Sequence, residues 1–284
     1  MLLSPQQKAS VMVESLSYIK KFHKQLVVIK YGGNAMINEE LKEAVIKDIV
    51  LMKYVGMNPI IVHGGGPEIT EMMERFGKKA EFIDGLRVTD QLTMELTEMV
   101  LCGKISNQIV TLLNQNDVMS VGMSGKDGRM IEAVQKDEKL GFVGEITNIN
   151  TELIQTVVDK GYIPVISPVG IGENGESYNI NADDVACKLA IALNAKKLVL
   201  ITDVEGVLMD AKDSSTLISQ IKTTEVEGYI SDGIIKGGMI PKIQGCTEAV
   251  SNGVERCHII DGRKHHSMLL EIFTDDGIGT MITN

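Results

Sequence analysis

The chain has 284 residues, of which 44% are hydrophobic and 23% charged, and its formal net charge is -10. This balance excludes a disordered chain and fits one large α/β domain or two closely packed lobes. The acidic surplus argues against an extended nucleic-acid or membrane-surface interface, although a few lysines and helix ends can still bind a phosphate locally.

The first predicted element is a helix that begins at Ser4. Ser4 is a suitable N-cap, Pro5 a suitable first helical residue and Gln7 the partner in a capping box. Apolar residues such as Met12 and Leu16 then recur at helical spacing. This wide apolar face fits packing on its own domain and binding to a partner equally well.

The cysteines and the N-terminal charges favour a cytoplasmic protein. None of the four cysteines forms a C-x-x-C pair, which favours free thiols in a reducing compartment over a metal site. Glu14, Lys20 and Lys21 interrupt the apolar residues near the N-terminus and argue against a signal peptide. No apolar run approaches the ~20 residues of a membrane span. We therefore expect no nucleic-acid partner, no membrane segment and no metal ligands from the protein.

Strand and helix patterns alternate from residue 26 onward. Strands are predicted at 26–30, 60–62, 118–123, 162–169, 197–202 and 258–260. Helices are predicted at 39–55, 92–113, 152–160, 184–193, 240–252 and 266–273. Segments 129–135 and 142–149 resemble a hairpin at the edge of the sheet. The alternation predicts a largely parallel sheet with helices on both faces, in two lobes that meet near Asp183.

Two glycine-rich segments follow the first two predicted strands: KYGG at 30–33 and HGGGP at 63–67. Ligands of parallel sheets bind beyond the carboxyl ends of the strands. Glycines there let backbone N–H groups approach an anion, and the next helix adds its positive end. Two tight turns without a ligand are the alternative, but two clusters and a lysine favour an anion site.

Three common catalytic motifs are absent from the sequence. There is no G-x-x-x-x-G-K-S/T, which excludes a P-loop enzyme. No G-x-G-x-x-G follows the first strand, which disfavours a dinucleotide dehydrogenase. No G-x-S-x-G is present, which removes the commonest signal of a serine hydrolase.

A few polar residues stand out in the remaining segments. Arg87 carries a guanidinium that can bind a carboxylate through two hydrogen bonds, although a lone arginine more often forms a surface ion pair. Asn179, Asn181 and Asp183 share one face of an extended segment before a helix, where they could line a site or face solvent. Pro241 places Lys242 at the start of a helix.

In order and spacing, these segments resemble the amino-acid kinase superfamily, over residues 18–282. KYGG specifies only the superfamily, whereas GLRVTD at 85–90, NINADD at 179–184 and GGMIPK at 237–242 resemble the branch that phosphorylates N-acetyl-L-glutamate. The resemblance implies an open αβα sandwich with a mainly parallel central sheet. It also implies that the lobe up to about residue 183 binds the acyl substrate and that the C-terminal lobe binds ATP.

The resemblance further assigns roles to residues at the motif positions. It implies catalytic roles for Lys30, Lys242 and Asp183, with the aspartate holding both lysines in place. It implies binding of N-acetylglutamate by Gly64, Gly65, Arg87 and Asn179. It implies binding of ATP by Gly32, Gly33, Thr202, Asp203 and Gly206.

The chemistry of such a reaction agrees with these residue types. A carboxylate nucleophile is already ionised at neutral pH, so it needs no general base. The barrier is electrostatic, and lysines, Mg²⁺ and backbone N–H groups can neutralise the charge. Mg²⁺ binds largely through phosphates and water, so few protein ligands are expected.

The C-terminal segment from residue 258 to residue 280 resembles the arginine-inhibited branch of the family, whose members carry an N-terminal helix and form hexameric rings. The resemblance implies that residues 1–24 form an oligomerisation helix and residues 25–284 the kinase domain. It implies a site for the inhibitor L-arginine formed by Tyr18, His258, Glu271 and Gly277. Without the resemblance, a buried strand histidine and a solvated glutamate would be the favoured interpretation.

Two alternatives remain open at the level of sequence. The first is a relative that phosphorylates aminoadipate or its carrier-protein form; Arg87 and Asn179 argue against it, but pocket size cannot be read from sequence. The second is a non-catalytic amino-acid sensor, against which Lys30, Lys242 and Asp183 count. The sequence does not decide whether a nitrogen-signalling protein binds.

Overall fold

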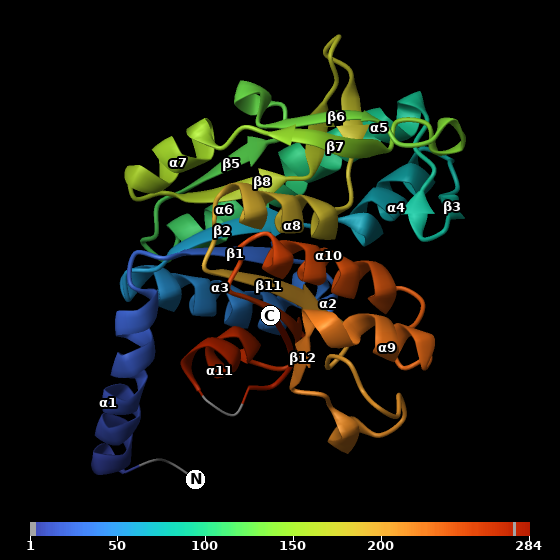
Figure 1. Ribbon diagram of the computed structural model, residues 1–284. Helices are drawn as coiled ribbons and strands as arrows, with labels where there is room; N and C mark the ends of the chain where they lie inside the picture. The colour runs from blue at the N-terminus through green and yellow to red at the C-terminus, as the bar shows by residue number, and fades with distance from the viewer. Residues whose placement is uncertain (1–3, 275–276) are drawn as a thin grey trace.

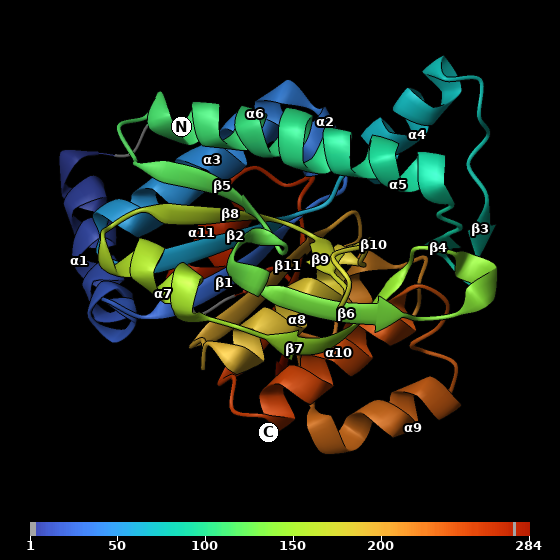
Figure 2. The same ribbon diagram turned by 90° about the horizontal axis from the view of Figure 1, so that it is seen from above.

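The computed structural model describes residues 4–274 and 277–284. An eight-stranded sheet in the order β12-β14-β13-β11-β1-β2-β8-β5 forms the middle layer, and helices cover both of its faces (Figures 1 and 2). The six strands from β13 to β5 run parallel, whereas β14 is antiparallel to β13. The predicted αβα sandwich with a mainly parallel sheet is therefore confirmed.

The strands of this sheet are β1 (Leu26–Tyr31), β2 (Asn58–His63), β5 (Ser120–Ser124), β8 (Ile163–Ser167), β11 (Lys197–Thr202), β12 (Gln220–Lys222), β13 (Arg256–Asp261) and β14 (Thr280–Thr283). The helices on one face are α2 (Asn34–Ile37), α3 (Glu39–Tyr54), α6 (Ser106–Asn114) and α11 (Ser267–Phe273). Those on the other face are α7 (Glu152–Asp159), α8 (Ala182–Ala192), α9 (Val226–Ser231) and α10 (Met239–Ser251).

Side chains that alternate along the central strands build one core on each face. Val27 and Ile29 of β1 pack in the same core as Ile49 of α3. Val28 points to the opposite face and packs in the core that contains Leu189 of α8. Strands buried on both faces read as continuous apolar runs, which is why the sequence located the central strands so readily.

Two predicted elements differ from the structure. The predicted hairpin is an antiparallel pair of β6 (Ile131–Gln135) and β7 (Gly144–Ile149), but it belongs to a separate four-stranded sheet with β9 (Val169–Ile171) and β10 (Ser177–Asn179), not to the edge of the main sheet. The single helix predicted at 92–113 is divided into α5 (Gln91–Glu98), a π-helix (Met99–Ile105) and α6. The apolar period cannot reveal one widened turn inside a helix.

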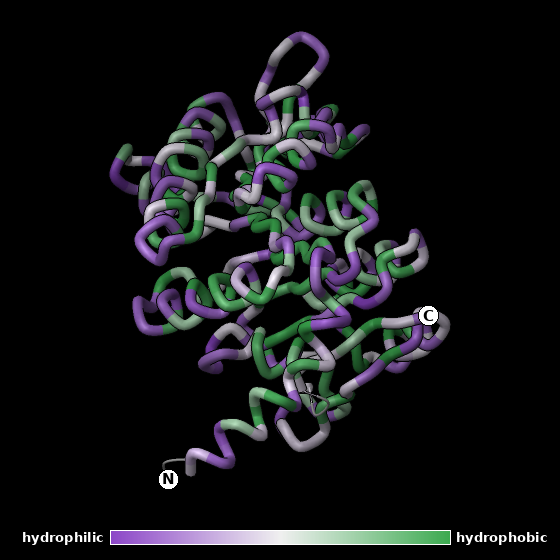
Figure 3. The backbone as a smooth tube through the Cα atoms, turned by 90° about the vertical axis from the view of Figure 1, so that its left-hand side faces the viewer, coloured by the Kyte–Doolittle hydropathy of each residue, from purple (hydrophilic) through white to green (hydrophobic). Residues whose placement is uncertain are grey.

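Helix α1 (Pro5–Phe22) extends away from the body of the chain (Figures 1 and 3). The predicted capping box is present, because Ser4 Oγ accepts from Gln7 N at 3.2 Å and Gln7 Oε1 accepts from Ser4 N at 2.9 Å. Met12 in the middle of the helix is 75% exposed, whereas Phe22 at its C-terminal end is buried. The helix is thus anchored at one end and leaves an apolar stripe uncovered. Residues 1–3 of the predicted oligomerisation segment lie outside the described residues.

Within the described ranges, no helix combines the length and the apolar character that a membrane span requires.

Candidate active site

A cavity of about 260 Å³ lies beyond the carboxyl ends of β1 and β2, where a parallel sheet is expected to bind ligands. It brings together residues that lie far apart in the sequence. The predicted site residues that line it are Lys30, Gly32, Gly33, Gly64, Gly65, Arg87, Asn179 and Asp183.

Asp183 pairs with two lysines at this cavity. Its carboxylate lies 3.1 Å from Nζ of Lys30, at the end of β1, and forms a second ion pair with Lys242, in the first turn of α10. Asn181, the N-cap of α8, accepts from Asp183 N at 2.7 Å and fixes the start of the helix. Burial raises the pKa of Asp183, but the two ammonium groups outweigh it and leave the pKa below its usual value. Two positive charges are thus held beside one ionised carboxylate.

The glycines of the KYGG segment make room for charged groups. A Cβ on Gly32 would lie 2.6 Å from Nζ of Lys30, which folds over that residue. A Cβ on Gly33 would lie 2.8 Å from Oδ2 of Asp203, and the φ of Gly33 is +71°. A larger residue at either position would push the ammonium or the carboxylate aside, and at Gly33 the positive φ additionally favours glycine.

The second glycine segment joins β2 to helix α4 (Gly66–Arg75). Gly64 N donates to the carbonyl oxygen of Tyr31 at 2.8 Å, which ties the two glycine segments together. Gly65 is the N-cap of α4 and Pro67 occupies its first turn. The first amides of an α-helix have no acceptor within the helix. This segment therefore offers N–H groups and a positive helix end to the cavity.

Arg87 is held rigidly on strand β4 (Leu86–Arg87), which pairs with β3 (Phe82–Ile83). Its Nη2 donates to the carbonyl oxygen of Gly66 and to Oγ1 of Thr70, both at 2.8 Å. The ring of Phe82 lies over the guanidinium, 4.8 Å from Cζ to the ring centre. Arg87 is therefore buried and held by neighbouring groups, and among the described residues it does not form the surface ion pair that is common for a lone arginine.

Thr89 connects Arg87 to Asn179, and sequence analysis did not single it out. Its Oγ1 donates to the carbonyl oxygen of Arg87 at 2.8 Å and accepts from Nδ2 of Asn179 at 3.2 Å. Thr89 is completely buried. Its place in the GLRVTD segment, two residues after the arginine, was the only available signal.

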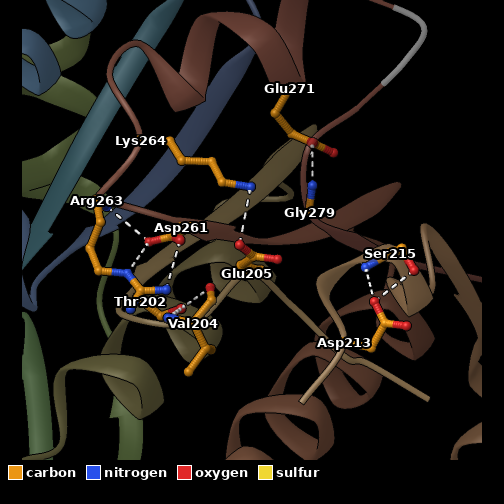
Figure 4. A network of polar contacts seen from close by, with 10 residues as sticks. All are labelled: Thr202, Val204, Glu205, Asp213, Ser215, Asp261, Arg263, Lys264, Glu271 and Gly279. Carbon is orange, nitrogen blue, oxygen red and sulfur yellow. Dashed lines mark hydrogen bonds and ion pairs between the residues drawn. The ribbon is translucent and has the colours of Figure 1, made fainter. Parts of the chain in front are cut away.

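The other predicted nucleotide-binding residues follow β11. Thr202, Asp203 and Gly206 are not among the residues that line the first cavity, but the carboxylate of Asp203 lies against Gly33 at its rim. Oγ1 of Thr202 accepts from Val204 N at 3.3 Å and so shapes the turn that follows the strand (Figure 4). Gly206 has a φ of +140° and packs against Thr280.

The neighbouring strand β13 ends in a second polar turn (Figure 4). Both carboxylate oxygens of Asp261 accept from the guanidinium of Arg263, each at 2.9 Å. Lys264 lies 3.7 Å from a carboxylate oxygen of Glu205, in the turn after β11. The carboxyl ends of two adjacent parallel strands therefore carry ordered polar loops beside the first cavity.

A second cavity of about 230 Å³ lies between α1, α11 and the β13–β14 pair. It contains all four residues of the predicted arginine site, namely Tyr18, His258, Glu271 and Gly277. The sequence separates these residues by up to 259 positions, so their convergence is a property of the fold.

One carboxylate organises the second cavity. Oε1 of Glu271 lies 2.6 Å from Nδ1 of His258, and Oε2 accepts from Ile278 N at 2.8 Å and Gly279 N at 3.3 Å (Figure 4 shows Glu271 beside Gly279). Burial raises the pKa of Glu271, but these hydrogen bonds leave it below its usual value. Burial lowers the pKa of His258. A neutral histidine that donates from Nδ1 presents an acceptor at Nε2, and that buried atom has no hydrogen-bond partner in the described chain.

Lys197 also lines the second cavity, and sequence analysis passed over it because it begins an apolar strand. Its ammonium lies 4.6 Å from the centre of the Phe22 ring, so it links β11 to the end of α1. Burial lowers the pKa of Lys197 to about 8. The cavity therefore combines an anionic group with cationic groups from Lys197 and Arg256.

The described residues contain no group of three or more histidine, cysteine, aspartate or glutamate side chains that could hold a metal ion. The four cysteines are unpaired.

Known proteins resemble this chain along its whole length. A sequence profile of the amino acid kinase family matches residues 25–261. The acetylglutamate kinase of Alkaliphilus metalliredigens is 68% identical over 284 residues, covering 100% of this chain and 90% of that protein. The acetylglutamate kinase of Syntrophomonas wolfei is 57% identical over 286 residues, with 100% of both proteins covered.

Solved structures share the fold at lower identity. N-acetylglutamate synthase from Neisseria gonorrhoeae, complexed with coenzyme A and N-acetyl-glutamate, has a TM-score of 0.85 at 23% identity; 97% of this chain is covered, which spans 63% of the synthase chain. Carbamate kinase from Giardia lamblia bound to AMP-PNP has a TM-score of 0.69 at 18% identity and covers 92% of this chain and 99% of its own. The family profile and the full-length relatives together lead to one conclusion: the chain belongs to the amino acid kinase family.

Proposed function

We propose that this chain transfers the γ-phosphoryl group of ATP to the side-chain carboxylate of N-acetyl-L-glutamate, a step of arginine biosynthesis. The observation that carries the proposal is the pairing of Lys30 and Lys242 with Asp183 at a cavity that also holds Arg87, Asn179 and the glycine segments. Full-length relatives that are named acetylglutamate kinase support the choice of substrate.

In this mechanism the fixed guanidinium of Arg87 and the amide of Asn179 orient the acyl substrate by hydrogen bonds to its polar groups. The side-chain carboxylate attacks the γ-phosphorus, the new carboxyl O–P bond forms, and the bond from phosphorus to the ADP oxygen breaks. Charge spreads over the transferring phosphoryl oxygens as this happens. Lys30 and Lys242 neutralise it, and Asp183 keeps both ammonium groups in place.

We assign the acyl substrate to the lobe up to about residue 183 and ATP to the C-terminal lobe. The polar turns after β11 and β13, with Thr202, Asp203 and Gly206, support a nucleotide there. Asp183 is already occupied by two lysines, so Mg²⁺ would be held mainly by the phosphates of ATP and would supply further neutralisation of their charge.

Trapping of the acyl phosphate with hydroxylamine tests the proposed reaction. The purified chain, ATP and Mg²⁺ should yield a hydroxamate with N-acetyl-L-glutamate, and much less with N-acetyl-L-aspartate, N-acetylaminoadipate or free glutamate. Hydroxamate from N-acetylaminoadipate and from no other acid would favour the alternative of a kinase that phosphorylates aminoadipate. No hydroxamate from any acid would favour a non-catalytic sensor.

Replacement of Arg87 by lysine should raise the KM for N-acetylglutamate about tenfold or more and leave the KM for ATP unchanged. Lysine keeps the charge but loses the planar fork, and a hydrogen bond to a charged group contributes about 1.5–3 kcal/mol. Steady-state kinetics with each substrate varied measures the effect. Arg75→Lys, an exposed change on the same helix that Arg87 contacts, is the control. An unchanged KM for the acid would remove Arg87 from the substrate site.

We further propose that the second cavity binds L-arginine as a feedback inhibitor. Arginine carries a guanidinium, an ammonium and a carboxylate. The cavity offers the Glu271 carboxylate, the cations of Lys197 and Arg256, and Nε2 of His258, which has no hydrogen-bond partner among the described residues. Tyr18 lines the same cavity from α1. The ligand's carboxylate would thus meet two cations, and its two cationic groups would meet one carboxylate and one neutral acceptor.

The uncovered stripe of α1 supports a homo-oligomer, which we propose is a hexamer built as a trimer of dimers. Val11, Met12, Val13 and Leu16 are all 45–75% exposed on a helix that stands away from the body. An exposed apolar surface of this kind usually marks a site of contact with another protein chain. Because α1 also lines the second cavity, assembly and arginine binding would be linked through Tyr18 and Phe22.

Replacement of Glu271 by glutamine should raise the arginine concentration for half-inhibition about tenfold or more and leave kcat without arginine unchanged. The change removes the negative charge that pairs with the ligand cation while it keeps the size of the side chain. Initial rates in an arginine titration measure this, and light scattering should show an unaltered mass. Glu227→Gln on the exposed face of α9 is the control. A parent enzyme that ignores millimolar arginine would contradict the regulatory proposal and leave the kinase proposal standing.

A further inference from the structure

His63 is a buried polar residue that the mechanism above does not use. It ends β2 directly before the glycine segment, and it is 0% exposed. Its Nδ1 lies 2.9 Å from the carbonyl oxygen of Gly64, and its Nε2 lies 2.9 Å from Oγ of Ser167, at the end of β8. The imidazole therefore bridges the glycine segment and the neighbouring strand.

These two contacts determine the tautomer. A carbonyl oxygen can only accept, so Nδ1 must carry the hydrogen. Burial lowers the pKa of His63 to about 4, which leaves the ring neutral at physiological pH. Nε2 is then an acceptor, and the hydroxyl of Ser167 donates to it. The same hydroxyl lies farther, at 3.3 Å, from the carbonyl oxygen of Leu101 in the π-helix.

Side chains of the π-helix also pack against the same segment. A Cβ on Gly65 would lie 2.6 Å from Cδ2 of Leu101 and would also clash with Cδ1 of Ile105. Both side chains are buried in the core, at 2% exposure. The backbone at Gly65 therefore has side chains packed against it. The carbonyl of Gly64, the preceding residue, is held by a hydrogen bond from His63.

The orientation of one peptide follows from that hydrogen bond. The Gly64–Gly65 peptide is planar and trans, so its carbonyl oxygen and its N–H point in opposite directions. When His63 holds the carbonyl on the protein side, it fixes the direction of the Gly65 N–H. That amide belongs to the start of α4, where helix geometry leaves the N–H groups available to a ligand.

We propose that His63 is a positioning residue that, as the Nδ1–H tautomer, orients the Gly64–Gly65 peptide so that its amide can bind the acyl or phosphoryl oxygens in the cavity. This inference rests on the proposed kinase reaction. It gives the histidine no proton-transfer step, since the carboxylate nucleophile has no proton to lose. Ser167 acts one step further out, because it fixes the rotation of the ring.

Two substitutions separate the contacts of the ring. In asparagine the side-chain nitrogen is the same number of bonds from the backbone as Nδ1 of histidine, so His63→Asn can still donate to the Gly64 carbonyl. In glutamine the side-chain nitrogen is the same number of bonds from the backbone as Nε2 of histidine. His63→Gln can therefore form a hydrogen bond with Ser167 but not with the Gly64 carbonyl. We expect His63→Gln to lower kcat/KM for N-acetylglutamate about tenfold or more, and His63→Asn to lower it several times less. The KM for ATP should stay within about twofold in both.

Two further measurements guard against a merely structural effect. Nitrogen NMR of the ¹⁵N-histidine-labelled protein should show a protonated Nδ1 and an unprotonated Nε2 for His63. Ser167→Ala should lower kcat/KM without altering that tautomer. The opposite tautomer, or equal losses in the asparagine and glutamine variants with equal losses in Tm, would overturn the inference. If the parent chain forms no acyl phosphate at all, the proposed function fails, while the NMR result still decides the tautomer.

Discussion

Lys30→Ala and Lys242→Ala should each lower kcat by about a hundredfold or more while changing the KM for either substrate much less. Both ammonium groups lie beside Asp183 at the first cavity. In the proposed mechanism, negative charge accumulates there as the phosphoryl group is transferred. Loss of one preorganised donor to such a transition state typically costs about 3 kcal/mol. We expect kcat to change more than KM because the charge develops in the transition state rather than in the bound substrates.

Single-turnover and steady-state kinetics of the acyl-phosphate assay measure this result. Lys160→Ala removes an exposed lysine at the end of α7 and serves as the control for general charge effects. Lysine variants that turn over at near the parent rate would refute the assigned chemistry. A rise in KM alone would instead mean that the lysines bind substrates without favouring the transition state.

Asp183→Asn should both inactivate and destabilise the protein. The neutral amide leaves Lys30 and Lys242 facing each other without the carboxylate that they share. Removal of one partner from a buried ion pair typically costs about 3 kcal/mol of folding free energy. The two ammonium groups are also freed to leave their positions, so kcat should fall at least as far as in a single lysine variant.

The pH dependence of stability provides a separate test for Asp183. The folded-state pKa is depressed, so the carboxylate contributes its full stabilisation above its unfolded pKa of about 4 and loses it as pH falls through the folded value. The gap in unfolding free energy between the parent and Asp183→Asn should therefore be constant from pH 7 to pH 5 and shrink below about pH 4. Urea unfolding at several pH values measures the gap. A gap that grows on acidification would contradict the sign.

The elements that were best predicted from the sequence are those whose residues share the same pattern of burial from one end to the other. β1, β2 and β11 are buried on both faces, and each contains a continuous run of apolar residues. Short elements gave no such signal: β9 and β10 have three residues each, too few to show a period. Helix α4 was missed because its start is the glycine-proline turn itself.

The candidate site shows the same division. The family motifs correctly selected residues that lie together, such as Lys30, Arg87 and Asp183, although their roles stay predictions. The motifs did not show which side chains hold those residues in place. Thr89 and His63 stand inside the motifs, but their hydrogen bonds to Asn179 and Ser167 span 90 and 104 positions of sequence, and no local pattern reports a contact at that range.

Strand β11 separates the two cavities by its own length. Lys197 at its first residue lines the second cavity, and Thr202 at its last residue belongs to the proposed nucleotide site, so about 17 Å of extended chain lies between them. A ligand in the second cavity therefore cannot displace ATP by filling the same volume. It can only shift an equilibrium between two arrangements of the strands, and such coupling is reciprocal. If arginine binds there as proposed, whatever factor it imposes on the affinity for a substrate, that substrate must impose on the affinity for arginine.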